Sequence, residues 1–253
     1  MSTSDVRARL AGILDRIADA ARSAGRAPGD VRLLPVSKVF PADVVMAAWP
    51  DLAAAGCATL AENRVQEASA KAGEMAALCA DAGVAAPRWA VIGPLQTNKA
   101  GQLAAFTDEF QALDRPKVAA ALQRRLEAAG RDLDVLVQVN TSGEGQKSGA
   151  APEELAEFVG RFGDGGEWPR LRLRGLMTMA MRSDGTAAGD AAVRGCFARL
   201  RELRDAIRDA GLPEGVSLDE LSMGMSGDFE AAIAEGATTV RVGQAIFGPR
   251  PAR

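Results

Sequence analysis

Residues 134–140 have the sequence DVLVQVN, which is apolar at four of the five positions between its ends. A strand with one face in water alternates apolar and polar residues, whereas a strand covered on both faces is apolar almost throughout. The stretch 134–140 is therefore typical of a parallel strand that has neighbouring structure on both sides. We use it as the reference from which the rest of the chain is interpreted.

Short β-branched stretches of this kind alternate with longer Ala-, Leu- and Arg-rich stretches that are typical of helices. We expect strands at 32–37, 58–60, 89–92, 109–113, 134–140, 171–177, 217–222 and 238–242. Helices are expected at 4–24, 41–54, 63–82, 98–104, 116–129, 152–162, 188–210, 228–234 and 244–247. Eight strand candidates, each followed by a helical segment, predict an α/β fold: a (β/α)8 TIM barrel with an extra N-terminal helix. No linker divides the chain, so residues 1–253 form a single domain in this prediction, and an open doubly wound sheet is the alternative.

The composition excludes several classes of protein. The 253 residues are 47% hydrophobic and 25% charged, which is ordinary for a chain with a full core. The net charge of −3 gives no reason to expect nucleic acid or an anionic membrane as a partner. No apolar stretch is long enough to span a membrane, and residues 1–7 lack the apolar segment of a signal peptide. We therefore expect a cytoplasmic protein.

The missing residue types limit the chemistry further. The chain has no His and no Tyr, so Ser-His-Asp, Cys-His and His-bearing metal sites are all excluded. The three cysteines, Cys57, Cys79 and Cys196, stand far apart without a CxxC pairing. We interpret them as buried small hydrophobic residues and expect no metal.

Lys38 follows the first strand candidate, in the sequence LLPVSKVF (33–40). The chain has 5 lysines against 25 arginines, so a lysine at the exit of a buried strand calls for a specific reason. An amine can lose its proton and attack a carbonyl, which a guanidinium cannot do. The alternative is a lysine that simply extends from the strand end to solvent.

A small-residue turn follows the seventh strand candidate, at 222–226 (SMGMS), and a helix is expected to open at Asp228. Such a turn exposes backbone N–H groups and hydroxyls to an anion, and Gly243 after the eighth strand lets backbone approach a ligand closely. Loops after strands 7 and 8 are a recurrent phosphate site of barrels. An ordinary turn with Ser226 as the helix N-cap is the alternative.

Arg241 lies between Val240 and Val242 in the eighth strand candidate, and it points into the barrel if the valines pack outwards. A buried Arg must be paired, either with a core carboxylate or with a ligand. An amine, a phosphate cradle and an Arg between them are the groups that hold pyridoxal 5′-phosphate as a Schiff base. Other phosphorylated ligands and a Schiff-base aldolase remain open on these residues alone.

Seven segments between residue 35 and residue 243, taken in their order along the chain, closely resemble the pyridoxal phosphate homeostasis protein family. They are PVSK (35–38), ENRVQE (62–67), IGPLQTNK (92–99), QVNTSGE (138–144), GLMTM (175–179), LSMGMSGDFE (221–230) and VRVG (240–243). Two positions depart from the usual family pattern, with Ala61 in place of a Gly and Ala90 in place of a common His. These departures concern the second and third loops.

The resemblance implies a barrel like the N-terminal domain of alanine racemase, with Lys38 as the Schiff-base lysine and Arg241 at the pyridine nitrogen. It also implies a set of residues around the cofactor. Ser222, Ser226, Gly243 and the backbone near Met223 and Gln244 would hold the phosphate, and Asn63 and Met177 would line the pocket.

Members of the family are thought to buffer and deliver pyridoxal phosphate without established turnover, with apo enzymes as possible recipients. We expect the same of this chain and expect a monomer. Racemases of this fold use a Tyr as the second base, which this chain lacks. The competing hypotheses are a racemase or lyase that uses Lys38 with a Cys or water, and a barrel that chiefly binds a protein partner.

Overall fold

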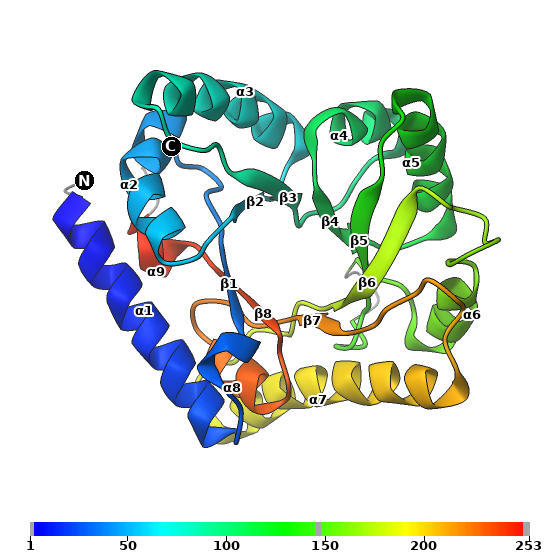
Figure 1. The fold of residues 1–253 in the computed structure, drawn as a ribbon. Coiled ribbons are helices and arrows are strands. Elements are labelled where there is room, and N and C mark those ends of the chain that lie inside the picture. The colour runs from blue at the N-terminus through cyan, green and yellow to red at the C-terminus, as the bar shows by residue number, and fades with distance from the viewer. Residues whose placement is uncertain (1–2, 145–147, 250–253) are drawn as a thin grey trace.

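The structure is a computed structural model that describes residues 3–144 and 148–249. Parallel strands form one 8-stranded sheet in the order β1-β8-β7-β6-β5-β4-β3-β2. A bridge between Val36 and Ala61 joins β1 to β2, so the sheet closes into a ring with helices outside it (Figure 1). This confirms the predicted (β/α)8 barrel and rules out the open doubly wound sheet.

The elements follow one another in strict alternation after the first helix. The strands are β1 (Arg32–Pro35), β2 (Thr59–Glu62), β3 (Arg88–Val91), β4 (Glu109–Leu113), β5 (Leu133–Gln138), β6 (Leu171–Met177), β7 (Glu220–Ser222) and β8 (Thr239–Val242). The helices are α1 (Thr3–Ser23), α2 (Ala42–Ala54), α3 (Val65–Ala82), α4 (Ala100–Phe106), α5 (Pro116–Ala129), α6 (Leu155–Gly160), α7 (Ala187–Ala210), α8 (Phe229–Ala234) and α9 (Gln244–Phe247). Short 3-10 turns lie at η1 (Pro28–Asp30), η2 (Thr97–Lys99) and η3 (Pro152–Glu154).

The boundaries differ most from expectation at β7, which was predicted over 217–222 but begins at Glu220. The Ser217 hydroxyl donates to the Asp219 carboxylate at 2.5 Å, and the Asp219 N–H donates back to that hydroxyl at 3.2 Å. The Ser217 N–H still donates to the Leu173 carbonyl of β6 at 3.1 Å, so the pairing with β6 is interrupted only between Ser217 and Glu220, where these local bonds lie. The helices expected at 98–104 and 152–162 both begin as the 3-10 turns η2 and η3.

The two faces of the strands are used differently. A small apolar cluster inside the ring is formed by β1, β2 and β3 and the residues just after them: Leu34, Val36, Ala61, Ala90 and Ile92. Arg241 is the register partner of Leu34, so its side chain shares this inner face. Val240 and Val242 belong instead to the larger core between strands and helices, as the sequence predicted.

Helix α1 packs across the outside of α2, α8 and α9 (Figure 1). Its buried face repeats at helical spacing: Val6, Leu10, Ile13, Ile17 and Ala21. On the same helix, the Arg16 guanidinium lies 4.6 Å from the centre of the Phe229 ring and pairs with Glu230 at 2.5 Å. The extra N-terminal helix thus covers the part of the barrel that carries the last two strands.

Three further findings concern the cysteines, metal-binding clusters and membrane-spanning helices. Cys57, Cys79 and Cys196 are free thiols and all are buried. Within residues 3–144 and 148–249, no three His, Cys, Asp or Glu side chains gather in a way that could hold a metal ion. None of the helices in this described part of the chain has the length and apolarity needed to cross a bilayer.

Candidate functional site

Lys38 lies just beyond β1, at the rim where the carboxyl ends of the strands meet. The bridge between Val36 and Ala61 joins β1 to β2, and Lys38 and Asn63 each follow one of these two strands. Lys38 is half-buried. Lys38 and Asn63 therefore both lie at the carboxyl ends of the two strands that close the barrel.

The residue after Lys38 has a strained backbone. Val39 has a φ of 69°, and it is the one non-glycine residue with positive φ among those the structure describes. A β-branched residue in this region costs on the order of 1–3 kcal/mol and persists only where the surroundings enforce it. The Phe40 N–H donates to the Ser37 carbonyl at 3.1 Å and closes the turn. The backbone of Lys38 is therefore held inside a tight, enforced turn.

A buried polar cluster lies directly behind this turn. The Lys71 ammonium, from α3, donates to the Ser37 carbonyl at 2.8 Å and forms an ion pair with the Glu62 carboxylate at the end of β2. The Ser37 hydroxyl donates to the same carboxylate oxygen at 2.7 Å. Burial raises the pKa of the Glu62 carboxyl above its usual value, against the opposing effects of Lys71 and Ser37. The cluster ties β1, β2 and α3 together immediately before Lys38.

The turn after β7 has one buried hydroxyl and one accessible one. Ser222 is fully buried, whereas Ser226 is half-buried. The Asp228 carboxylate accepts a hydrogen bond from the Met225 N–H at 2.6 Å, which shapes the loop from within. The alternative of Ser226 as N-cap is wrong, because α8 begins at Phe229 and Asp228 takes the N-cap position. The Ser226 hydroxyl therefore has no capping role at α8.

Arg241 is 4% exposed, and its guanidinium makes only neutral contacts. One nitrogen donates to the Ser222 hydroxyl at 2.7 Å and another to the Thr178 carbonyl at 2.8 Å. No carboxylate of the described residues lies within ion-pairing distance of it. Burial lowers the pKa of Arg241 to about 10, and the charge of Asp228 opposes this. Of the two alternatives left by the sequence, the core carboxylate is ruled out.

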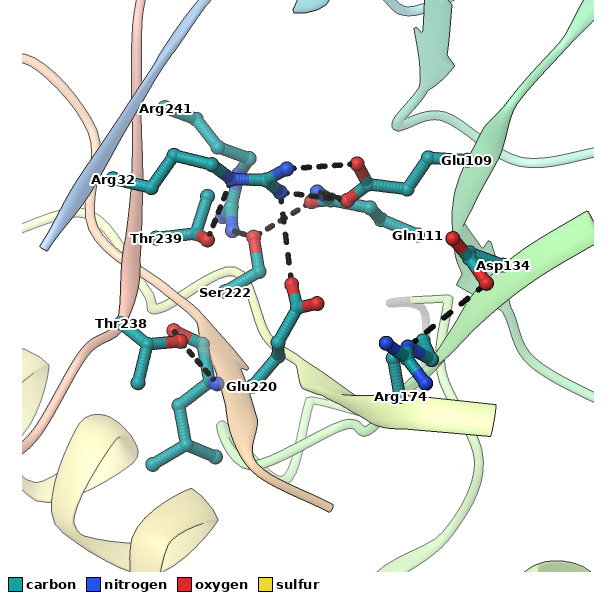
Figure 2. A network of polar contacts seen from close by, with 11 residues as sticks. Arg32, Glu109, Gln111, Asp134, Arg174, Glu220, Ser222, Thr238, Thr239 and Arg241 are labelled. Carbon is teal, nitrogen blue, oxygen red and sulfur yellow. Dashed lines mark hydrogen bonds and ion pairs between the residues drawn. The ribbon is translucent and has the colours of Figure 1, made fainter. Parts of the chain in front are cut away.

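A chain of hydrogen bonds crosses the barrel interior and ends at Arg241 (Figure 2). The Arg32 guanidinium donates to both Glu109 oxygens at 2.8 and 3.0 Å, and the Gln111 amide donates to Glu109 at 2.5 Å. The Ser222 hydroxyl donates to the Gln111 amide oxygen at 2.6 Å and accepts from Arg241. The Ser222 hydroxyl therefore holds the Arg241 guanidinium in position, through its own bond to Gln111.

The other candidate residues lie on the same side of the ring. Met177 is fully buried and is the register partner of Ser222, and Met223 is also fully buried. Gly243 follows β8, where a Cβ would lie 2.7 Å from the Val36 carbonyl, so only glycine fits beside β1. Gln244 is exposed and opens α9.

All nine candidate residues thus gather at the carboxyl ends of five consecutive strands of the ring, from β6 through β7, β8 and β1 to β2. They are Lys38, Asn63, Met177, Ser222, Met223, Ser226, Arg241, Gly243 and Gln244. Sequence reasoning assigned no role to Glu62, Lys71 and Gln111, which support Lys38 and Arg241 from behind. A signal for Lys71 exists in its spacing, because it shares the buried face of α3 with Val65 and Ala68.

Comparison with known proteins identifies the family of the chain. The family model of the alanine racemase N-terminal domain matches residues 13–251. The pyridoxal phosphate homeostasis protein of Pseudomonas aeruginosa is 43% identical over 250 residues, which cover 98% of this chain and 96% of that protein.

Two solved structures superpose on the whole barrel. An unknown protein from Bifidobacterium adolescentis, solved as a crystal structure, has a TM-score of 0.85 at 37% identity, with 96% of this chain and 95% of that chain covered. PipY of Synechococcus elongatus, solved with PLP bound, has a TM-score of 0.73 at 31% identity, with coverage of 96% and 100%. The chain therefore belongs to the pyridoxal phosphate homeostasis protein family, which shares the barrel of the alanine racemase N-terminal domain.

Proposed function

We propose that this chain binds pyridoxal 5′-phosphate as a Schiff base on Lys38 and serves the homeostasis and delivery of the cofactor without catalytic turnover. The observation that carries the proposal is Arg241, a buried guanidinium without a carboxylate partner, on the inner face that leads to the same rim as Lys38. The names of the relatives support it, as does the PLP bound in the PipY structure.

The residues present fit the cofactor. Pyridoxal phosphate supplies an aldehyde that condenses with a primary amine, and Lys38 offers one at the rim. Arg241 can only donate hydrogen bonds, so it would leave a pyridine nitrogen unprotonated. The turn at 222–226 and Gly243 would hold the phosphate, and Asn63 and Met177 would line the ring. An unprotonated pyridine is a weak electron sink, and the chain has no Tyr or His base, which together support the proposal of no turnover.

The visible spectrum of the purified protein tests the proposal. We expect wild-type protein to take up pyridoxal phosphate and to show the absorbance band of a Schiff base. Lys38→Ala and Lys38→Arg should both lose the band, because the amine and not its charge forms the bond. Lys117→Arg, at an exposed lysine of α5, is the matched control and should keep it. A colourless wild type that takes up no cofactor would refute the proposal.

Absence of turnover is tested separately. Common amino acids incubated with the loaded protein in deuterated water should keep their α-protons. Exchange that depends on Lys38 would instead favour a racemase or lyase.

We further propose a cytoplasmic, single-domain monomer that passes the cofactor to apo enzymes. Analytical ultracentrifugation should then give a mass near 26.3 kDa.

A further inference from the structure

A cavity of about 690 Å³ opens at the rim beside the Lys38 site. It is bounded by the start of α3, the segment from β3 to η2, and the residue before α5. Asn63 lines it, so the cavity begins next to the candidate cofactor pocket, but its remaining walls belong to loops after β2, β3 and β4. A cavity of this size suits a small molecule.

The walls carry more positive than negative charge. Arg64, Lys99 and Arg115 line the cavity, and Glu67 is the one carboxylate among its lining residues. Arg64 pairs with Glu67 at 3.2 Å, on an exposed part of the wall. Lys99 is half-buried, and its ammonium has neither an ion pair nor a hydrogen bond within the described residues. A cation that is partly desolvated and unpaired gains from an anionic partner.

Arg115 is held in position for such a partner. Its guanidinium pairs with Asp114 at 2.6 Å and donates to the Leu95 carbonyl at 3.5 Å, across the cavity edge. With Asp114 included, three cations still face two carboxylates. The 18-residue helix α3 begins at the cavity without a side-chain cap, so its first N–H groups add to the positive potential.

We propose that this cavity is a second anion site, which binds a small phosphate monoester through Lys99 and Arg115. A tetrahedral dianion can accept bonds from an ammonium, a guanidinium and backbone N–H groups at once, which suits this mixed set of donors. The inference does not rest on the function proposed for Lys38, because the two sites share only Asn63, and the proposed donors Lys99 and Arg115 are not among the candidate cofactor residues.

Acetylation of individual lysines, followed by peptide mass spectrometry, tests the site in the cofactor-free or the loaded protein. Glycerol 3-phosphate is the probe, and sodium chloride at equal ionic strength controls for screening. At a probe concentration of about ten times its Kd, labelling of Lys99 should slow about tenfold. Labelling of Lys117, which is exposed and lies outside the cavity, should stay unchanged and serves as an internal control.

Two variants assign the effect to the cavity. Arg115→Gln should raise the Kd of the probe about tenfold, since a charged hydrogen bond is lost, so the same probe concentration should slow labelling of Lys99 only about twofold. Arg124→Gln, at an exposed arginine of α5, should leave the protection intact. Ser226→Ala, in the candidate cofactor loop, should also leave it intact, so failure here is distinct from failure at Lys38. Equal protection of Lys99 and Lys117, no protection of either, or full protection in Arg115→Gln would overturn the proposal.

Discussion

Lys71 connects the turn that carries Lys38 to helix α3. Its ammonium pairs with a Glu62 carboxylate that is 0% exposed and donates to the Ser37 carbonyl at 2.8 Å. Lys71→Met would leave that buried carboxylate without a counter-charge. We expect this to lower the free energy of unfolding by about 3–5 kcal/mol at neutral pH, measured by urea denaturation.

The cost of Lys71→Met should grow as the pH rises. Burial already raises the pKa of Glu62, and loss of the ammonium raises it further. A carboxyl whose pKa is higher in the folded than in the unfolded protein favours the folded state through its protonated form. This contribution is fully present below the unfolded pKa of about 4.3 and is lost as the pH rises through the folded pKa. The difference from wild type should therefore widen from about pH 5 to about pH 8, by at most about 1.4 kcal/mol per pH unit.

Lys117→Met is the matched control for both measurements, because Lys117 is exposed and its ammonium has no hydrogen bond or ion pair in the described part of the chain. It should differ little from wild type at either pH. A cost of Lys71→Met that is equal at both pH values, or that shrinks as the pH rises, would contradict the buried pair.

Single residues were predictable from the sequence where their type was unusual for the place. Lys38 stood out in an Arg-rich chain, and Arg241 stood out between two valines of a strand. Glu62 and Gln111 gave no such signal, because their partners come from elements distant in the sequence. Ser222 was expected at a phosphate, and that role stays a prediction beside its bonds to Gln111 and Arg241.

At the scale of elements, Gly93 lets the chain after β3 approach the residue that follows β2. A Cβ at position 93 would lie 2.1 Å from the Asn63 carbonyl, so Gly93→Ala must push that backbone away. We expect a loss of stability and, if the proposed function holds, weaker uptake of pyridoxal phosphate through displaced Asn63. Gly73→Ala in α3 meets nothing within 4 Å and should stabilise by about 1 kcal/mol. Similar urea midpoints for the two variants would contradict this.

Gln111 connects β4 to β7 through the Ser222 hydroxyl (Figure 2). Gln111→Leu would leave buried partners unsatisfied, at a cost of about 1–3 kcal/mol in unfolding free energy. If Arg241 meets the pyridine nitrogen as proposed, its loosened support should also shift the pH titration of the visible band. Gln102→Leu, at a half-buried glutamine of α4, should shift neither. If the pH titration of the band is unchanged in Gln111→Leu, this chain of hydrogen bonds does not influence the cofactor, and the prediction is wrong.

The order and type of elements followed from the sequence because apolar runs and helical periodicity are local signals. The near-continuous apolar run of β5 was enough to indicate a parallel sheet. The start of β7 was missed because its pairing with β6 is interrupted after Ser217, where side-chain bonds join Ser217 and Asp219, and such bonds leave no clear pattern in a single sequence.

At the scale of the whole molecule, α1 packs on the part of the barrel that carries many of the nine candidate residues, and we expect it to stabilise that part. Ile13 is 3% exposed on its buried face, whereas its neighbour Leu14 is only partly buried. Ile13→Ala should cost about 2–5 kcal/mol, and Leu14→Ala clearly less. Thermal unfolding of the two variants measures the difference. Equal costs would mean that α1 is not docked through this face.

The central claim is that Lys38, among the five lysines of the chain, holds the cofactor. Borohydride reduction of the loaded protein makes a Schiff base permanent, and peptide mass spectrometry then identifies the lysine that carries it. We predict a pyridoxyl group on the Lys38 peptide and on no other lysine at equal occupancy. Labelling chiefly at another lysine, or none at all, would contradict the account.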